Sequence, residues 1–456
     1  MSRSSLQLIG SIALGNALVP LNSTMLVVAL PFIARDAGTD LASASWLITT
    51  YLIAMAALQP IGGRIGDRYG RRKLMLGALA YFGLASIGAA VAQGLVPLAF
   101  FRLQQAVAGA LIVPNGMGIL RRAAGERAGM HFGLIGAISG TAASIGPLLG
   151  SVLVLFDWRL LFVVNVPIIA IALALALVNV PDDIARTDAR FDIVGVVALG
   201  LILSGAAWVL TSAAKGIDAV LLAGAAIVVI AAIAFVRYES RLADPALPPA
   251  LFGIREFTAA NVAISASNMT LYATLLAIPA LLASDAATAI QTGVALFALS
   301  AAMAVLGPFV GMVIDRFGAK WPPAFGGLLI VAGCIGTALA LASPSLNFVA
   351  LLASLLVMGA GVSFTFPASR VAAVDAAPQR YVALASGVVS TSRYFGGMSG
   401  AIVAGAVLTA LPAATRGPTL FAILASGGVL TSLASLGMPG QSSSRTVPRS
   451  PSTSIS

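Results

Sequence analysis

The densest charge cluster of this chain is the stretch Gly63-Arg64-Ile65-Gly66-Asp67-Arg68-Tyr69-Gly70-Arg71-Arg72-Lys73. It lies between two long apolar runs in a chain of which only 9% is charged. A fainter copy recurs much later as Gly311-Met312-Val313-Ile314-Asp315-Arg316-Phe317-Gly318-Ala319-Lys320. A short charged loop that occurs twice, each time between two apolar runs, predicts a membrane protein built as a two-fold repeat.

The composition excludes an ordinary soluble protein. The 456 residues are 59% hydrophobic, with a mean hydropathy of +1.00. A soluble domain of this length cannot bury that much apolar surface, so lipid is the expected solvent. The net charge of +10 is typical of the basic loops that orient such a protein, and nucleic-acid binding is not expected. The single cysteine, Cys334, cannot form an intrachain disulfide.

An all-α membrane protein with fourteen transmembrane helices is predicted when each span needs about 20 apolar residues. The predicted ranges are 6–33, 46–65, 74–93, 97–120, 129–155, 161–180, 191–213, 219–237, 258–283, 291–313, 322–342, 346–370, 382–409 and 419–437. With the N-terminus inside, most Lys and Arg residues fall in the inner segments, a strong positive-inside bias. We therefore expect both termini in the cytoplasm and the chain in the inner (cytoplasmic) membrane.

The repeat also predicts how the chain is divided. Residues 1–180 would form an N-terminal six-helix bundle and residues 258–437 a C-terminal one, with an inserted helix pair and its loops at 181–257. Residues 438–456, rich in Ser and Pro, would form a disordered cytoplasmic tail. Two six-helix bundles around a midplane cavity are typical of transporters.

The first charged loop has a physical logic of its own. Gly63 and Gly66 would let two helix ends approach closely. Asp67 would pair with an Arg or face the positive N-terminal end of a helix, and Gly70 would turn the chain. Arg71 and the basic residues after it would anchor the loop at an anionic leaflet. The alternative is a basic loop that only sets topology, which needs neither this spacing nor a second copy.

This loop resembles the signature of the major facilitator superfamily, Gly-x-x-x-Asp-Arg-x-Gly-Arg-Arg-Lys. The first copy matches residue for residue and the second copy in part. The resemblance implies a latch between the two halves at the cytoplasmic side. The residues that it assigns to this gate are Gly63, Asp67, Arg68, Gly70, Arg71, Asp315 and Arg316.

The fourth predicted span carries a charge, Arg102, at a cost on the order of 3 kcal/mol in lipid, so Arg102 should face a cavity or a partner. Arg102-x-x-Gln105, followed by Gly109-Ala110, resembles the second signature of the superfamily, with Ala106 where Gly is usual. The resemblance implies a role for Arg102 in proton coupling. An arginine that only ties helix ends through backbone carbonyls is the alternative.

The fifth predicted span carries small residues and a proline on one stripe. Gly140, with Gly146-Pro147-x-x-Gly150, resembles the helix-kink signature of the exporters in the superfamily. Pro147 would loosen or kink the helix, and the glycines would permit close helix contact. A plain packing face is the alternative, because such stripes are common in helix bundles.

Further motifs narrow the resemblance. Trp158-Arg159-x-x-Phe162-x-x-Asn165-x-Pro167 resembles an element of the fourteen-span drug:proton antiporters of the EmrB/QacA type. Phe191-Asp192-x-x-Gly195 at the inserted pair and Ser390–Gly397 in the thirteenth span agree with that subfamily. The resemblance implies secondary active export of small amphiphilic molecules or drugs, by proton antiport with alternating access.

One departure from the subfamily pattern concerns the proton. The first span has Asn22 where these antiporters usually have Asp, and an amide cannot exchange a proton at accessible pH. The other candidate carboxylates lie near span ends, and the one histidine, His131, is best explained as a solvated interfacial side chain. Coupling, if present, would use Arg102 with a partner near a span end.

The predicted cavity between the halves is lined by polar side chains. They are Asn22, Arg102, Gln105, Asn115, Asn261, Asn268 and Arg393. Two buried arginines without acidic neighbours suit neutral, zwitterionic or anionic cargo better than polycations. An importer or uniporter of a small metabolite, and a non-transporting receptor on the same fold, are the alternatives.

An enzyme is not expected, because the chain has one His, one Cys and no nucleotide-binding loop. No cofactor and no metal are expected. The expected partners are a small-molecule substrate, a proton and the lipid bilayer, and the protein is expected to act as a monomer.

Overall fold

The computed structural model describes residues 3–124, 128–181, 192–213, 218–242, 245, 247–282, 286–343, 346–378 and 381–440. Within these residues all regular structure is helical. The first helices are α1 (Arg3–Asp36), α2 (Leu41–Tyr69), α3 (Arg71–Ala90), α4 (Leu95–Ala124), α5 (Ala128–Val154), α6 (Leu160–Val163) and α7 (Asn165–Asn179). We call them the N-terminal group.

Two further helices, α8 (Ile193–Ala213) and α9 (Ala219–Glu239), follow and pack against each other. A short 3-10 helix, η2 (Pro249–Gly253), leads into the remaining helices. These are α10 (Arg255–Leu282), α11 (Ala286–Phe317), α12 (Trp321–Ala342), α13 (Phe348–Ala376), α14 (Val382–Ala410) and α15 (Ala413–Ser435), which we call the C-terminal group.

Local chemistry explains several helix starts. Asp40 caps α2 by accepting a hydrogen bond from the Ser43 amide at 2.7 Å, and Asp218 caps α9 through the Leu221 amide at 2.7 Å. Asn347 does the same for α13 through the Ala350 amide at 3.0 Å. Such caps satisfy amides that have no partner within the helix, which matters most where little water is present.

Eleven helices in the described part of the chain are long and apolar enough to cross a membrane, or twelve if a bent pair is one span. The bent pair is α2, whose segments Ser43–Gln59 and Ile61–Tyr69 meet at 53°. Helices lie at all the predicted ranges, but the predicted number of fourteen is not reached by this criterion. In α5 the criterion applies only to Ile138–Val154, because most side chains earlier in this helix lie outside the described residues, and α14 carries Ser, Thr and Arg side chains that lower its hydropathy.

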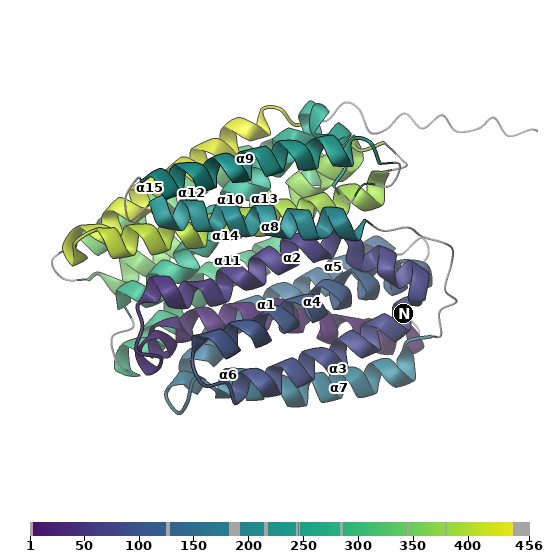
Figure 1. Ribbon diagram of the computed structural model, residues 1–456, viewed down its shortest axis with the longest axis horizontal. Helices are drawn as coiled ribbons and strands as arrows, with labels where there is room; N and C mark the ends of the chain where they lie inside the picture. Colours follow the sequence, from purple (N-terminus) through teal and green to yellow (C-terminus); the bar gives the residue numbers. More distant parts are fainter. Residues whose placement is uncertain are drawn as a thin grey trace, which may run out of the picture.

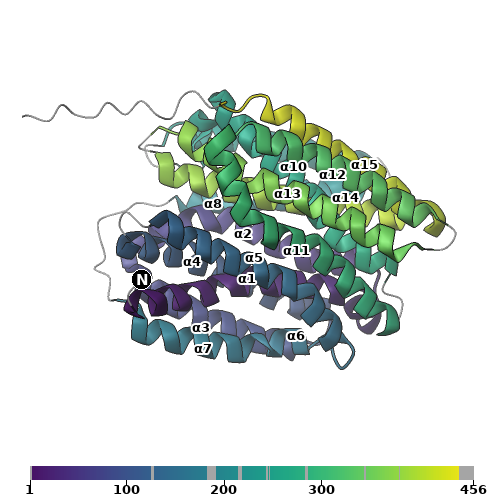
Figure 2. The same cartoon turned by 180° about the vertical axis from the view of Figure 1, so that it is seen from behind.

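The long helices run side by side in two groups (Figure 1), with α3, α6 and α7 at one edge and α12 and α15 at the other (Figure 2). The groups meet where α2 packs on α14 and α5 packs on α11. In the first contact Thr391 donates its hydroxyl to the Ala56 carbonyl at 2.8 Å, and in the second Ser144 donates to the Ser300 carbonyl at 2.7 Å.

The pair α8 and α9 lies beside the first of these contacts. Helix α8 packs against both α2 and α14, and α9 packs on α8. Most large apolar side chains of α9 are exposed, among them Val220, Ile227 and Ile230. Exposed apolar side chains along a whole helix are expected where lipid is the solvent, so α9 has the character of a lipid-facing helix.

Candidate functional site

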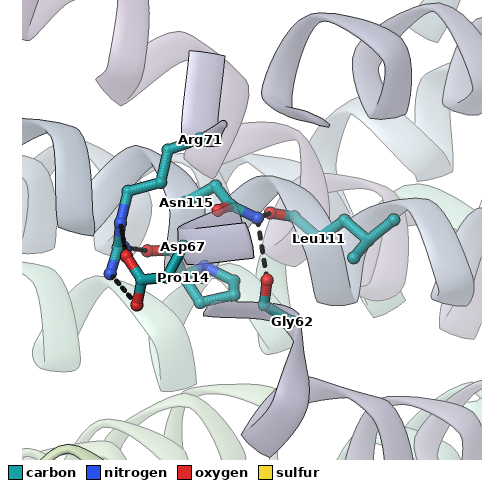
Figure 3. Close-up of polar contacts among 6 residues, drawn as sticks. All are labelled: Gly62, Asp67, Arg71, Leu111, Pro114 and Asn115. Atoms are coloured by element: carbon teal, nitrogen blue, oxygen red, sulfur yellow. Dashed lines mark hydrogen bonds and ion pairs between the residues drawn. The ribbon is translucent and has the colours of Figure 1, made fainter. Parts of the chain in front are cut away.

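The first signature loop forms a tight set of contacts at the end of α2 (Figure 3). Arg71 binds Asp67 through two parallel bonds, from Nε to Oδ1 at 2.9 Å and from Nη2 to Oδ2 at 3.0 Å. Its Nη1 also donates to the Pro114 carbonyl of α4 at 3.2 Å. Asn115 donates to the carbonyls of Gly62 at 3.0 Å and Leu111 at 2.7 Å.

We call Asp67, Arg71, Pro114 and Asn115 the loop clamp. Its bonds join α2, α3 and α4, all within the N-terminal group. The sequence predicts a latch between the two halves, whereas these bonds hold three helices of one half together. Asn115, predicted to line the central cavity, lies in the clamp instead and is fully buried there. Bidentate arginine–carboxylate pairs fix geometry as well as charge, so the clamp sets how these helix ends meet.

Close packing at the clamp depends on glycine. A Cβ atom at Gly66 would lie 1.6 Å from Asn115 Oδ1, and one at Gly118 would lie 1.4 Å from Arg71 Nη1. The prediction for Gly66 therefore agrees with the structure. The same prediction for Gly63 does not, because a Cβ there would meet Pro114 only at an ordinary 3.6 Å. At Gly62, which the sequence did not single out, the added atom would lie 2.2 Å from the Ala110 carbonyl oxygen.

The second copy of the loop shares the turn but differs in its side chains. Gly70 and Gly318 both have positive φ, 95° and 79°, and each closes a bond to the carbonyl four residues back, at 2.9 and 2.8 Å. Glycine is required for such a turn. Arg316 is exposed and lies over the Phe317 ring at 5.4 Å. The side chain of Asp315 lies outside the described residues. Arg68, also predicted for the gate, is exposed and lies over the Tyr69 ring at 5.5 Å.

A buried polar network lies deeper in the N-terminal group. Arg102 donates from Nη1 to Gln105 Oε1 at 2.8 Å, and Asn22 donates to the same oxygen at 3.3 Å. Gln105 donates to Ser86 Oγ at 2.8 Å, and Asn165 donates to Asn22 Oδ1 at 3.0 Å. We call these five residues the central network. They come from α1, α3, α4 and α7, and all are buried.

The structure thus brings together Asn22, Arg102 and Gln105, which the sequence assigned to one site. It adds Ser86 and Asn165, to which the sequence gave no role. Asn165 belongs to the Trp-Arg-x-x-Phe-x-x-Asn-x-Pro element. An amide one helical turn after Phe162, in an apolar segment, was the feature of the sequence that could have indicated a role for it. Ser86 gave none, because serine is common in membrane helices.

Each of two arginines lies on an aromatic ring near the meeting of the two helix groups. Arg102 lies over the Tyr51 ring of α2 at 4.4 Å. Arg393 lies over the Tyr394 ring at 4.6 Å and the Phe366 ring at 5.5 Å, and donates to the Tyr394 hydroxyl at 2.6 Å. A cation on an aromatic face is stabilised by the ring quadrupole, more so away from water.

The other two predicted cavity amides make only local bonds. Asn261 donates to the Phe257 carbonyl at 2.8 Å and Asn268 to the Ile264 carbonyl at 3.0 Å, each one turn back on α10. Both are buried. They face the interior of the C-terminal group but are not linked to other helices by these bonds.

The predicted exporter stripe on α5 serves two different contacts. A Cβ at Gly146 would lie 2.0 Å from Thr24 Oγ1, and one at Gly150 would lie 2.8 Å from the Met25 carbonyl oxygen, so both glycines seat α5 on α1. Gly140 instead faces α11, where a Cβ would lie 3.8 Å from Ala304 Cα. Pro147 lies inside the helix between them. The side chain of His131 lies outside the described residues.

The turn between α5 and α6 is fixed by an aspartate that the sequence did not single out. Asp36, at the end of α1, accepts from Trp158 Nε1 at 3.2 Å and from Arg159 Nη2 at 3.3 Å. Arg159 also lies over the Trp158 ring at 4.3 Å. The motif that resembles the drug antiporters therefore ties the ends of α1 and α5 together.

The features described so far define a class: a multi-pass helical membrane protein in which a buried arginine, Arg102, and a partly buried one, Arg393, lie near the contact between two groups of helices. The chain belongs to the Major Facilitator Superfamily, whose model matches residues 12–254 and 258–453. The expectations of a transporter and of no enzymatic activity are confirmed by this membership and by the names of the relatives.

Curated relatives share most of the chain. An uncharacterized MFS-type transporter, YvkA, of Bacillus subtilis (strain 168) is 33% identical over 449 residues, covering 97% of this chain and 98% of its own. The tetracenomycin C resistance and export protein of Streptomyces glaucescens is 30% identical and matches 87% of this chain and 75% of its own. The multidrug resistance protein B homolog of Mycobacterium tuberculosis (strain H37Rv) is 28% identical, with 88% and 75% covered.

Solved structures show the same fold at low identity. The nucleoside transporter NupG aligns with a TM-score of 0.68 at 14% identity, covering 95% of this chain and 99% of its own. A peptide transporter POT in complex with sulfate aligns with a TM-score of 0.70 at 13% identity, with 94% of each chain covered. At this identity the likeness supports the fold alone.

Proposed function

We propose that this protein is a secondary active exporter of small amphiphilic molecules or drugs across the cytoplasmic membrane. The observation that carries the proposal is the position of the two arginine–tyrosine pairs. Tyr51 lies on α2, the helix that packs on α14, and α14 carries Arg393 and Tyr394. Relatives whose names state drug resistance or export support the direction of transport.

Alternating access would operate through the two contacts between the groups. Helices α5 and α11 pack with a bond from Ser144 to the Ser300 carbonyl, and α2 and α14 pack with a bond from Thr391 to the Ala56 carbonyl. Each of these hydrogen bonds contributes about 1 kcal/mol net, so breaking them adds little to the cost of separating the helices. The N-terminal and C-terminal groups, residues 1–180 and 258–437, would rock as units around the arginine pairs.

We also propose the fourteen-span, EmrB/QacA-type arrangement, with α8 and α9 as the inserted pair of residues 181–257. The lipid-facing character of α9 and the packing of α8 on both α2 and α14 support it. Both termini would lie in the cytoplasm, which places the loop clamp at the cytoplasmic end of α2. The protein would act as a monomer.

Proton antiport is the coupling that the resemblance implies, and we propose it with the central network as the place to look. Asn22 and Gln105 form hydrogen bonds through their side-chain amides, and an amide does not titrate at accessible pH. If the network nevertheless couples transport, an Asn22→Asp variant should transport more steeply with the pH gradient than the wild type. A variant indistinguishable from wild type would exclude position 22 as the coupling site.

The function is tested with the purified protein in liposomes and with cells. Cells that produce the protein should tolerate higher concentrations of at least one amphiphilic toxic compound than cells that produce an Arg102→Gln variant at the same level. In liposomes, the same compound should be transported, and collapsing the pH gradient should slow transport if protons are exchanged. Equal susceptibility across a broad panel, without transport in liposomes, would contradict an exporter.

A further inference from the structure

We propose that the cargo is an organic anion, held between Arg102 and Arg393 with a flat apolar portion against the aromatic rings beside them. The inference rests on the proposed export function and specifies its substrate class. It is argued from the partners of the two guanidinium groups, from their position on opposite sides of the seam between the helix groups, and from the direction of the electrical force.

Arg102 is a buried cation whose described partners are neutral. It is 1% exposed, its Nη1 binds the Gln105 amide oxygen, and its face lies on Tyr51. Its Nε, although buried, has no hydrogen-bond partner among the described residues. A buried charge with an unused hydrogen-bond donor is costly in free energy unless an opposite charge binds it. Neutral partners orient the guanidinium but leave its charge uncompensated.

Arg393 has the same character in the C-terminal group. Its partners among the described residues are the Tyr394 hydroxyl and the rings of Tyr394 and Phe366, and its buried Nε has no hydrogen-bond partner there. These partners are neutral, so this region of the C-terminal group becomes more favourable when an anion enters.

Carboxylates in the described residues lie elsewhere. Ion pairs there include Asp67 with Arg71, and Arg159 with Asp36 and Asp157, all at helix ends. The one fully buried acidic side chain of the described part is Glu239, at the end of α9, where it accepts from the Leu247 amide. A positively charged cargo would therefore meet two arginines at the centre without a described counter-charge.

The two cations face one shared region. Arg102 lies over the Tyr51 ring of α2, and Arg393 lies over the Tyr394 ring of α14. Helices α2 and α14 pack on each other, so the two arginine–tyrosine pairs lie on helices that meet between the two halves. An anion that contacts both arginines would draw the halves together, because its attraction to each offsets the repulsion between them. An anion of this kind therefore favours the closed form through which alternating access must pass.

The charge of such a cargo also supplies a driving force. A membrane potential that is negative inside pushes an anion outward, whether or not a proton moves the other way. Export of an anion thus fits a central site in which Asn22 replaces a titratable carboxylate. The one departure from the antiporter pattern, the amide Asn22, then has an explanation, because the potential can drive an anion outward without a titratable carboxylate.

The experiment uses the full-length purified protein in liposomes and three probes with the same ring system. They are 2-naphthalenesulfonate, the neutral methyl 2-naphthyl sulfone and the cationic 2-naphthyltrimethylammonium. A potassium gradient with valinomycin imposes a membrane potential of either sign. The sulfonate should be transported at least ten times faster than the other two probes, and it should compete with them for transport. Its transport rate should rise at least fivefold when the potential drives the anion in the direction measured.

Variants of Arg393 separate charge from shape. Arg393→Gln should lower sulfonate transport at least tenfold, and Arg393→Lys, which keeps the charge, should recover a substantial part of it. Arg237→Gln, on the exposed face of α9, is the matched control and should transport the sulfonate as the wild type does. Elution as a single species in gel filtration, and an unchanged unfolding temperature, exclude misfolding as the cause.

The outcomes distinguish the inference from the proposed function. Transport of the cation or the neutral sulfone in preference to the sulfonate would overturn the anion site while leaving export in place. Sulfonate transport that is indifferent to the potential, or to Arg393→Gln, would overturn it as well. If none of the three probes crosses faster than in protein-free liposomes, the anion site is overturned, while the exporter assignment is decided by the broad panel of compounds in cells.

Discussion

The two helix groups follow the same order along the chain but use their polar side chains differently. In the N-terminal group, Asn22, Gln105 and Asn165 bond across helices and hold Arg102 in place. In the C-terminal group, Asn261 and Asn268 donate to carbonyls of their own helix. One group therefore contains an arginine fixed by links among four helices, and the other contains an arginine held by adjacent aromatic rings.

In the C-terminal group the bonds between helices come from hydroxyl side chains, such as Ser265 to the Ser392 carbonyl and Thr270 to the Leu424 carbonyl, and they accompany close backbone approach. A Cβ atom at Gly359 would lie 1.9 Å from the Leu299 carbonyl oxygen, and one at Gly400 would lie 2.0 Å from that of Met269. Small residues allow helices in lipid to gain dispersion contacts without polar links. We infer that the N-terminal group positions the cargo while the C-terminal group adapts around it, and the following predictions test that difference in order of expected effect.

The largest effect is expected at Arg102. An Arg102→Gln variant removes the charge and leaves the Gln105 oxygen with one donor fewer, so transport should fall at least 100-fold. Arg237→Gln is again the matched control. Transport is measured as initial rates in liposomes at equal protein content. A variant with near-normal rates would show that the central network is structural, and the contrast between the groups would lose its functional meaning.

Locking the contact between the groups should be nearly as severe. A Cβ at Gly405 would lie 3.7 Å from Ser45 Oγ, so Ser45→Cys with Gly405→Cys brings two sulfur atoms within disulfide reach. In a Cys334→Ala background, oxidation should lower transport at least tenfold and a reductant should restore it. Each single cysteine variant is the control. Full transport by the cross-linked protein would mean that α2 and α14 do not separate at this end.

A third prediction concerns the two copies of the signature loop. Asp67→Asn breaks the bidentate bond to Arg71 without adding or removing a basic residue, and should reduce transport about tenfold while insertion stays normal. Arg316→Gln in the second copy should reduce it no more than about twofold, because the described contact of Arg316 is an exposed ring. Equal effects would indicate that both copies act as one latch between the halves.

The sequence predicted helix positions well because apolar length and charged loops are local properties. It also placed Asn22, Arg102 and Gln105 together, since the last two share a helix face and the first belongs to a motif. It did not find Ser86 or Asp36, whose importance depends on how separate helices are rotated against each other. Rotation is decided by packing between helices, and one sequence shows only the period within each helix.

The same limit explains the clamp. The spacing of Gly66, Asp67 and Arg71 indicated a close helix approach and an ion pair. It did not indicate which helix would pack against this loop. The resemblance implied a partner in the other half, and the structure provides Pro114 and Asn115 of α4. Asn115 was assigned to the cavity because a buried amide in a membrane helix has no feature in the sequence that distinguishes a packing role from a cargo role.

The smallest predicted effect tests the contrast between the groups most directly, through stability alone. Asn22→Ala removes two bonds to other helices, so the free energy of unfolding should fall by about 2 kcal/mol. Asn268→Ala removes a bond to its own helix, whose carbonyl keeps its helical partner, and should cost less than about 1 kcal/mol. Both are measured by denaturant unfolding of the solubilised protein. Equal losses would mean that Asn268 contributes as much to stability as the cross-helix amide Asn22, and the contrast between the buried amides of the two groups would not hold.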